Sequence, residues 1–141
     1  SEFVTGGYRT QLEKDELVTR FILPPPMKQP LIDRYLQLGR RNALNITRQS
    51  LTGQFLVDGG TIRLCRLVDG ALMSKPQRLV EVEQALIGKP LNADTIDAAV
   101  QVLGGIIEKA IGGRWSAPYK IPVFIDMFRQ MLEDVMSEQK K

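Results

Sequence analysis

Histidine is absent from the 141 residues of this sequence, and cysteine occurs once. Without histidine the chain cannot build a Ser-His-Asp or Cys-His catalytic site, nor a histidine-ligated metal centre. The lone Cys65 cannot form an internal disulfide or a protein-only cysteine cluster for zinc or iron–sulfur. It lies in the apolar stretch 62–68, where a buried, unreactive thiol is expected. We therefore expect no catalytic residue and no metal site in this chain.

Long hydrophobic runs are missing as well. No apolar stretch approaches the roughly 20 residues that a membrane-spanning helix needs, and no secretion signal stands at the start. Hydrophobic residues make up 43% and charged residues 25% of the sequence, the balance of an ordinary globular domain. The chain begins with Ser1 rather than Met, which suggests a processed form or a piece of a longer protein. The cytoplasm is the expected compartment, since a single cysteine is typical of reducing surroundings.

The net charge of +3 is unevenly distributed along the chain. Residues 1–80 hold 12 Lys and Arg against 7 Asp and Glu, a balance of +5. Residues 81–141 hold 7 against 9, a balance of −2. A locally positive surface suits a phosphate-bearing ligand, an acidic partner or nucleic acid.

The first half of the sequence is typical of β-strands. The apolar, β-prone segments are 17–23, 32–38, 45–57 and 61–68. Pro24–Pro26 stops the first of them abruptly, which predicts a strand that ends at a sheet edge. Asp58–Gly60 joins the last two, and its glycines can adopt the positive φ angles of a tight turn. The sequence therefore predicts a long hairpin preceded by two strands.

After Pro76 the hydrophobic period becomes helical. A first helix around residues 79–86 is expected to stop at Gly88. Asn92 is a good N-cap for a second helix, and the apolar stripe within 123–135 predicts a third.

A strand-rich half followed by a helix-rich half predicts an α+β fold. We expect an antiparallel sheet of three to four strands packed against about three C-terminal helices, a two-layer sandwich. Residues 1–137 are expected to form a single domain, and residues 138–141 a frayed tail.

Several short stretches occur in the order and with the spacing of one known family. They are Gly7–Thr10, Asp15–Pro24, Tyr35 with Arg40–Arg41, Ala43 with Asn45–Ile46, Asp58–Gly60, Lys75–Arg78, Leu86–Leu91 and Arg114–Lys120. Through them the chain, from about Phe3 to Leu132, resembles the C-terminal domain of the FAD-binding (medium) subunit of molybdenum hydroxylases, the carbon monoxide dehydrogenase flavoprotein and xanthine dehydrogenase family. Two positions depart from that pattern. Leu36 stands where many relatives have lysine, and Asn45 where they often have aspartate.

The resemblance implies one domain of an electron-transferring oxidoreductase. In such enzymes the FAD subunit takes electrons from the clusters of an iron–sulfur subunit and passes them to an acceptor such as NAD or a quinone, while a molybdopterin subunit transforms the substrate. The main FAD-binding loops are expected in a preceding N-terminal domain of the same subunit. This domain would then bind no FAD and catalyse nothing alone. It would cover one side of the isoalloxazine and complete the flavin site.

The same resemblance implies which residues contact the cofactor. Val18 and Leu36 are the expected flavin neighbours, and Tyr35, Arg40 and Arg41 are expected to line the approach. An arginine at this place could stabilise the anionic reduced flavin or bind the phosphate of an acceptor, since its planar fork suits oxyanions.

Two other interpretations stay open. A basic interaction module that binds nucleic acid or an acidic protein would account for the positive first half, although aromatic residues do not alternate with the arginines as a single-strand platform requires. The flavoprotein interpretation, by contrast, expects no nucleic acid. A stand-alone enzyme is disfavoured by the missing histidine and the missing nucleophile. Trp115, beside Arg114, could stack on a base or a flavin, but packing against the helices is the favoured interpretation.

Overall fold

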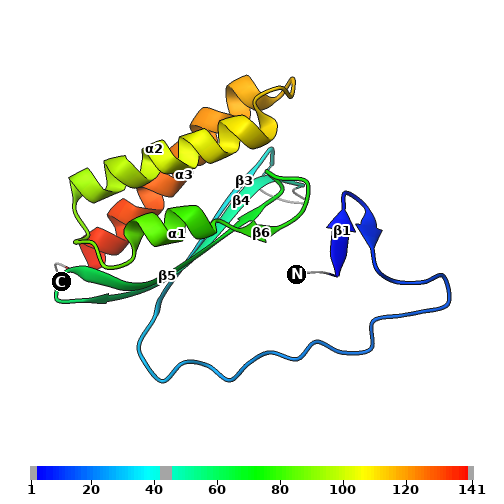
Figure 1. The fold of residues 1–141 in the computed structure, drawn as a ribbon, viewed down its shortest axis with the longest axis horizontal. Helices are drawn as coiled ribbons and strands as arrows, with labels where there is room; N and C mark the ends of the chain where they lie inside the picture. The colour runs from blue at the N-terminus through cyan, green and yellow to red at the C-terminus, as the bar shows by residue number, and fades with distance from the viewer. Residues whose placement is uncertain (1–2, 42–45, 140–141) are drawn as a thin grey trace.

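The computed structural model describes residues 3–41 and 46–139. The strands are β1 (Val4–Gly6), β2 (Arg9–Thr10), β3 (Ile32–Gly39), β4 (Thr47–Asp58), β5 (Thr61–Gly70) and β6 (Gln77–Arg78). The helices are α1 (Val80–Leu86), α2 (Ala93–Ile111) and α3 (Ala117–Glu138). Strands β3 to β6 form an antiparallel sheet in that order, and β1 pairs only with β2. All three helices lie on one side of the larger sheet (Figure 1), which confirms the predicted two-layer α+β sandwich.

The centre of the sheet is the predicted hairpin, β4 and β5. Gly59 and Gly60 have φ angles of 54° and 73°, so the turn uses the left-handed backbone that glycine adopts without strain. Asp58 pairs with Thr61 across this turn. Strand β4 begins at Thr47 rather than at the predicted residue 45, and Asn45 lies outside the described residues.

The two faces of the sheet differ because successive side chains of a strand point to opposite sides. The helix-facing side of β4 and β5 carries the buried residues Leu51, Phe55, Cys65 and Leu67. Their neighbours in sequence project to the other side, which no helix of the described residues covers (Figure 1). We call that side the open face.

Helix α2 begins at the predicted cap and α1 ends just before the predicted glycine, whereas α3 extends beyond the predicted stripe 123–135 on both sides. The Oδ1 of Asn92 accepts a hydrogen bond from the backbone N–H of Thr95 (2.9 Å), which caps α2. Gly88, with a φ of 80°, follows the end of α1. On α1 the buried carboxylate of Glu83 accepts from the backbone N–H of Leu67 (2.8 Å) and from Nε of Arg78 (3.0 Å). These bonds tie α1 to the edge of the sheet.

The core lies between the sheet and the helices. Its largest fully buried side chains include Phe55 of β4 and Phe124 and Phe128 of α3. Gly53 of β4 lets α3 approach closely, since a Cβ there would lie 2.5 Å from Sδ of Met131 and 2.6 Å from the Phe55 ring. Burying each large apolar side chain contributes about 1.5–3 kcal/mol, so this layer holds the fold together.

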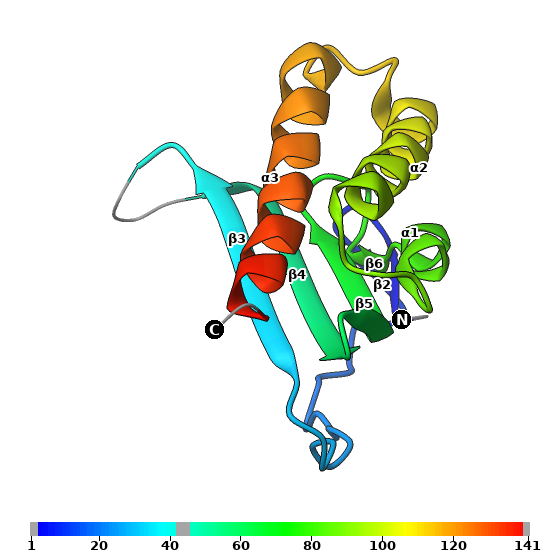
Figure 2. The ribbon, with the colours of Figure 1, turned by 90° about the vertical axis from the view of Figure 1, so that its left-hand side faces the viewer.

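Helix α3 lies over β3 and β4 (Figure 2). At its C-terminal end Glu138 forms an ion pair with Arg34 of β3. Near its start the Nε2 of Gln49 donates to the backbone oxygen of Lys120 (2.6 Å). These two contacts place the last turn of α3 beside β3 and its first turn beside the start of β4.

Residues 11–31 form no regular secondary structure, so the strand predicted over 17–23 is wrong for this chain. A strand needs a neighbour for its backbone hydrogen bonds, and the larger sheet begins only at β3. The segment runs as an extended chain on the side of the sheet away from the helices (Figure 1). We call residues 3–31 the N-terminal extension and residues 32–138 the body.

The limits of the expected single domain, residues 1–137, stay a prediction. Helix α3 continues to Glu138, and residues 140 and 141 of the expected tail lie outside the described residues. Within the described ranges, no helix combines the length and the apolar character needed to cross a membrane.

Candidate functional site

The open face presents a row of polar side chains around one exposed tyrosine. Gln54 of β4 donates from Nε2 to Oδ1 of Asp33 on β3 (2.9 Å), and Nη1 of Arg66 on β5 donates to Oε1 of Gln54 (3.3 Å). Tyr35 donates from its hydroxyl to Oε1 of Gln37 (3.3 Å). The first two bonds link side chains across β3, β4 and β5, and the third links two residues of β3. The open face therefore carries polar side chains held by hydrogen bonds.

Tyr35 and Leu36 are adjacent in β3 and project to opposite faces. The Tyr35 side chain is 58% exposed on the open face. Leu36 pairs with the buried Leu51 and packs against the hydrophobic core on the helix side. A ligand on the open face would therefore touch the Tyr35 ring, but only the backbone of Leu36.

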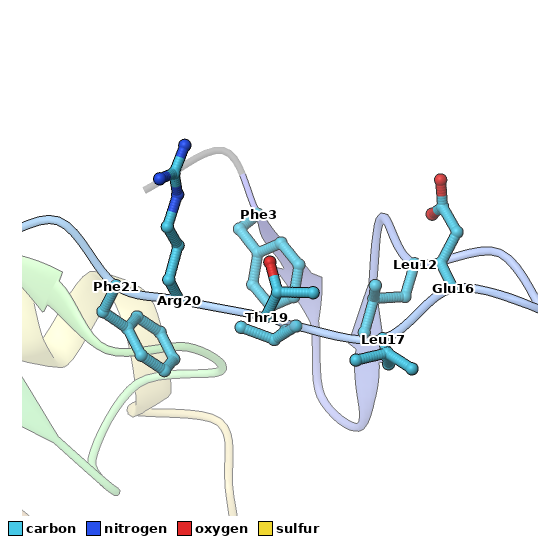
Figure 3. A pocket seen from close by; sticks show the side chains of 8 residues that line it. Phe3, Leu12, Glu16, Leu17, Thr19, Arg20 and Phe21 are labelled. Atoms are coloured by element: carbon cyan, nitrogen blue, oxygen red, sulfur yellow. The ribbon is translucent and has the colours of Figure 1, made fainter.

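Val18 lies in the N-terminal extension, apart from β3. It lines a hollow of about 700 Å³ together with Phe3, Leu12 and the other residues from Glu16 to Phe21. Arg20 and Phe21 point to opposite sides there, as successive residues of an extended chain do (Figure 3). The apolar residues of this segment are largely exposed, and Phe21 has 85% of its surface accessible. The hollow is therefore an exposed surface that is lined largely by apolar side chains.

Arg40 and Arg41 follow β3 directly, and both are exposed. Both also take part in polar interactions. Arg40 lines a groove of about 410 Å³, which we call the end groove. The residues that line it are Leu38, Gly39, Arg40, Arg48, Trp115 and Tyr119. The structure thus distributes the five expected cofactor contacts over the open face, the extension and the region after β3.

Of the six residues that line the end groove, only Arg40 is an expected contact, and two of the others are a charged and an aromatic side chain from distant parts of the chain. Arg48 stands at the start of β4, and only the antiparallel pairing of β3 with β4 brings it near Arg40. Trp115 was expected to pack against the helices, and this expectation is wrong, because 92% of its surface is exposed. The signal for Trp115 was its place in a glycine-rich loop next to Arg114. No local signal marks Arg48.

The buried ionisable groups are placed for structure, since solvent reaches none of them. Burial raises the pKa of the Cys65 thiol to about 12, with a further contribution from the Glu83 carboxylate. Burial also raises the pKa of Asp69, whose Oδ2 accepts from the backbone N–H of Met73 (3.0 Å). The described residues contain no cluster of three or more histidine, cysteine, aspartate or glutamate side chains that could hold a metal.

The chain is similar to a known domain family and to characterised proteins. The family model described as "CO dehydrogenase flavoprotein C-terminal domain" matches residues 35–135. The xanthine dehydrogenase FAD-binding subunit of Escherichia coli O157:H7 is 23% identical over 96% of this chain and 46% of its own length. The nicotinate dehydrogenase FAD-subunit of Eubacterium barkeri is 24% identical over 92% of this chain and 44% of its own length.

Among solved structures, reconstituted CO dehydrogenase from Oligotropha carboxidovorans has the same fold. It superposes with a TM-score of 0.76 at 23% identity, over 96% of this chain and 47% of the matched chain. The chain therefore spans less than half of the length of the proteins that it matches.

Proposed function

The chain belongs to the CO dehydrogenase flavoprotein C-terminal domain family, and from this premise we propose that it completes the flavin site in the FAD subunit of a molybdenum hydroxylase. The observation that carries the proposal is the open face of the sheet. One side of the sheet is covered by helices, and the other presents Tyr35 within a hydrogen-bonded polar row. That side is the available surface for a cofactor held mainly by other parts of the subunit.

The residues of the open face suit a flavin. An isoalloxazine is flat, with an aromatic surface and polar edges, and it needs stacking partners and hydrogen-bond donors and acceptors. Tyr35 offers a ring and a hydroxyl. Beside it Gln37 accepts from that hydroxyl and donates from Nε2 to Oγ1 of Thr47 (2.6 Å), so it orients the Tyr35 side chain. FAD supplies the electron-transfer chemistry when it is bound. The domain's own residues would exclude water and orient the ring.

The features of the N-terminal extension support the proposal that it pairs with another domain of the same subunit. Its segment Leu17–Leu23 has apolar residues on both sides of an extended chain, as a strand inside a larger sheet does. In the chain by itself these residues are exposed. We infer that the segment becomes a strand when it pairs with the preceding FAD-binding domain. The strand predicted from the sequence would then exist in the whole subunit.

The remaining partners follow from the proposed role. A flavin subunit of this kind would receive electrons from an iron–sulfur subunit, and a molybdopterin subunit would transform the substrate. This domain would be inactive alone, and the cytoplasm stays the expected compartment. The alternative, a basic interaction module, is favoured by one observation, the cationic end groove. Nucleic acid is disfavoured as a ligand because four Lys and Arg in residues 3–31 stand against three Asp and Glu, and because aromatic residues do not alternate with the arginines.

Substitutions on the open face test the proposal in the full-length subunit. Tyr35→Ala and Gln37→Ala should weaken FAD retention and shift the flavin reduction potential, because both remove contacts beside the ring. Gln101→Ala is the matched control, since Gln101 is exposed on α2, on the opposite side of the sheet. The flavin absorbance of the purified subunit and a redox titration give the readout. If both open-face variants behaved like Gln101→Ala, the proposed flavin contact would be refuted.

A further inference from the structure

The loop between β5 and β6, residues 71–76, is held against the start of α3. Lys120 donates from Nζ to the backbone oxygen of Ala71 (3.0 Å), and Arg114 donates from Nη1 to that of Leu72 (3.2 Å). Ala71 has a φ of 61°, a left-handed conformation that a residue with a side chain adopts only when its surroundings impose it. The side chain of Leu72 is fully buried. The contacts with α3 therefore hold this segment, which we call the β5–β6 loop, in a strained conformation.

Two buried polar side chains lie at the base of the β5–β6 loop. Gln49 of β4 and Asp69 of β5 are both inaccessible to solvent. Asp69 pairs with Leu51, and Gln49 stands two residues before Leu51, so the two side chains are diagonal neighbours on the helix-facing side of the sheet. Diagonal neighbours lie about 7–8 Å apart, a separation that long side chains can span. We call Gln49 and Asp69 the buried pair.

Each member of the buried pair bonds one neighbour and leaves one oxygen unpaired. Nε2 of Gln49 donates to the backbone oxygen of Lys120 (2.6 Å), and Oδ2 of Asp69 accepts from the backbone N–H of Met73 (3.0 Å). Oε1 of Gln49 and Oδ1 of Asp69 are buried and have no hydrogen-bond partner among the described residues. Buried polar atoms are nearly always paired in folded proteins, so two unpaired oxygens at one place need an explanation.

One hydrogen atom would satisfy both oxygens. An amide oxygen and an ionised carboxylate only accept hydrogen bonds, so they cannot pair with each other, whereas a protonated carboxyl group can donate one. A proton on Oδ1 of Asp69 would let this atom donate to Oε1 of Gln49. Burial raises the pKa of Asp69 above the ordinary aspartate value, although the backbone N–H groups of Met73 and Gln77 act in the opposite direction. Burial and the unpaired amide oxygen thus both favour the protonated form.

Charged side chains stand on each of the elements near the buried pair. They are Arg48 of β4, Lys75 of the β5–β6 loop, Arg78 of β6, Glu83 of α1, Arg114 of the loop before α3 and Lys120 of α3. Glu83 forms an ion pair with Arg78, which balances its charge. The remaining cations favour the ionised form of Asp69, because an opposite charge stabilises a carboxylate. Burial therefore holds the proton against these cations, and the proton should leave as the pH rises.

We propose that Asp69 binds a proton in the folded chain and shares it with Gln49, and that this bond makes the β5–β6 loop a pH-sensitive element of the fold. With the proton bound, Oδ1 of Asp69 donates to Oε1 of Gln49, whose amide in turn donates to the first turn of α3. When the proton passes to solvent, two acceptors face each other and the bond is lost. The strained loop at Ala71 then loses one of its supports. The buried pair lies on the helix side of the sheet, so the proposal does not depend on the flavin contact at the open face.

The titration of Asp69 in the 141-residue chain tests the shared proton. With isotope-labelled aspartate carboxyl groups, NMR should show one aspartate that titrates above the ordinary value, and its signal should be missing in Asp69→Asn. Gln49→Met removes Oε1 and keeps a side chain of similar length, so the proton affinity of Asp69 should fall about tenfold, the loss of one hydrogen bond. Burial alone predicts the opposite sign, because the new neighbour is less polar. Gln101→Met is the matched control, since Gln101 is exposed on α2.

Hydrogen exchange of the Met73 N–H measures the state of the β5–β6 loop. In Asp69→Asn the side-chain amide can donate to Gln49 at every pH. The exchange rate of the wild type, divided by that of Asp69→Asn at the same pH, should therefore rise as Asp69 loses its proton. This comparison needs no Gln49 variant, and circular dichroism verifies that each chain folds.

The proposal is overturned if Asp69 titrates at or below the ordinary aspartate value, since a water molecule or nothing would then join the two oxygens. It is also overturned if Gln49→Met leaves the proton affinity of Asp69 unchanged or increases it. A ratio of Met73 exchange rates that stays constant with pH would show that the β5–β6 loop does not respond to the proton. None of these outcomes bears on the flavin proposal, because the assays contain no FAD.

Discussion

The body and the N-terminal extension use the same kinds of apolar residue in opposite ways. In the body, Phe55 and Phe128 are fully buried between the sheet and the helices. In the extension, 85% of Phe21 and 84% of Leu23 are exposed, and β1 and β2 contact no other element of the described residues. The body thus buries its own hydrophobic side chains, whereas the extension leaves Phe21 and Leu23 exposed. The proposed pairing with another domain of the subunit would cover them.

The largest difference between the body and the extension is expected when one phenylalanine side chain of each is replaced by alanine. Phe55→Ala should lower the free energy of unfolding of the chain by about 3–5 kcal/mol, because it opens a cavity under α3. Phe21→Ala, the matched control in the extension, should change it by less than about 0.5 kcal/mol. Urea unfolding followed by circular dichroism measures both. Similar losses in the two variants would mean that the extension is part of the folded core.

The buried carboxylate of Glu83 tests how strongly the contact between α1 and the sheet stabilises the body. Glu83→Ala should lower the free energy of unfolding by about 1–3 kcal/mol, because it leaves the buried N–H of Leu67 without an acceptor. Glu81→Ala serves as control, since Glu81 lies two residues earlier in the same helix and is exposed. The same urea titration compares them. An effect of Glu83→Ala no larger than that of Glu81→Ala would show that α1 does not need this anchor.

Local signals explain which parts of the fold could be predicted. The turn at Asp58–Gly60 and the cap at Asn92 depend on the residues themselves, and both were found from the sequence. The state of residues 17–23 could not be found in this way, because a strand exists only when another strand accepts and donates its hydrogen bonds. Their apolar pattern predicted a strand, but no strand forms because no neighbouring strand of the described residues pairs with them.

The candidate sites were predicted less completely, for a related reason. Tyr35 was named through the family resemblance, but the separation of Tyr35 from Leu36 follows from which face the helices cover. Arg48 joins Arg40 only through strand pairing, and Trp115, in the loop before α3, is exposed. Such positions depend on tertiary structure, for which one sequence carries no local pattern.

A smaller effect is expected in the pH dependence of the free energy of unfolding of the body. Burial raises the pKa of Asp69 in the folded chain above its unfolded value. The folded state therefore binds more protons between the two values, and its stability falls as the pH rises through that window. Relative to Asp69→Asn, the wild type should lose stability as the pH rises through this window, as a buried carboxylate becomes charged. Asp58→Asn, at the exposed turn, should leave the profile unchanged, and an identical profile for Asp69→Asn would contradict this account.

The smallest effect should come from the largest deletion. Removing residues 1–30 should change the free energy of unfolding of the isolated body by less than about 0.5 kcal/mol, because no described residue of the extension is buried. Protection of Cys65 from a thiol reagent is a second readout, since the buried thiol reacts only when the core opens. In the full-length subunit, by contrast, Phe21→Ser should cost about 1.5–3 kcal/mol if the segment is covered there. If the deletion made Cys65 reactive, the body would need the extension for its stability. If Phe21→Ser left the stability of the full-length subunit unchanged, no other surface would cover the extension.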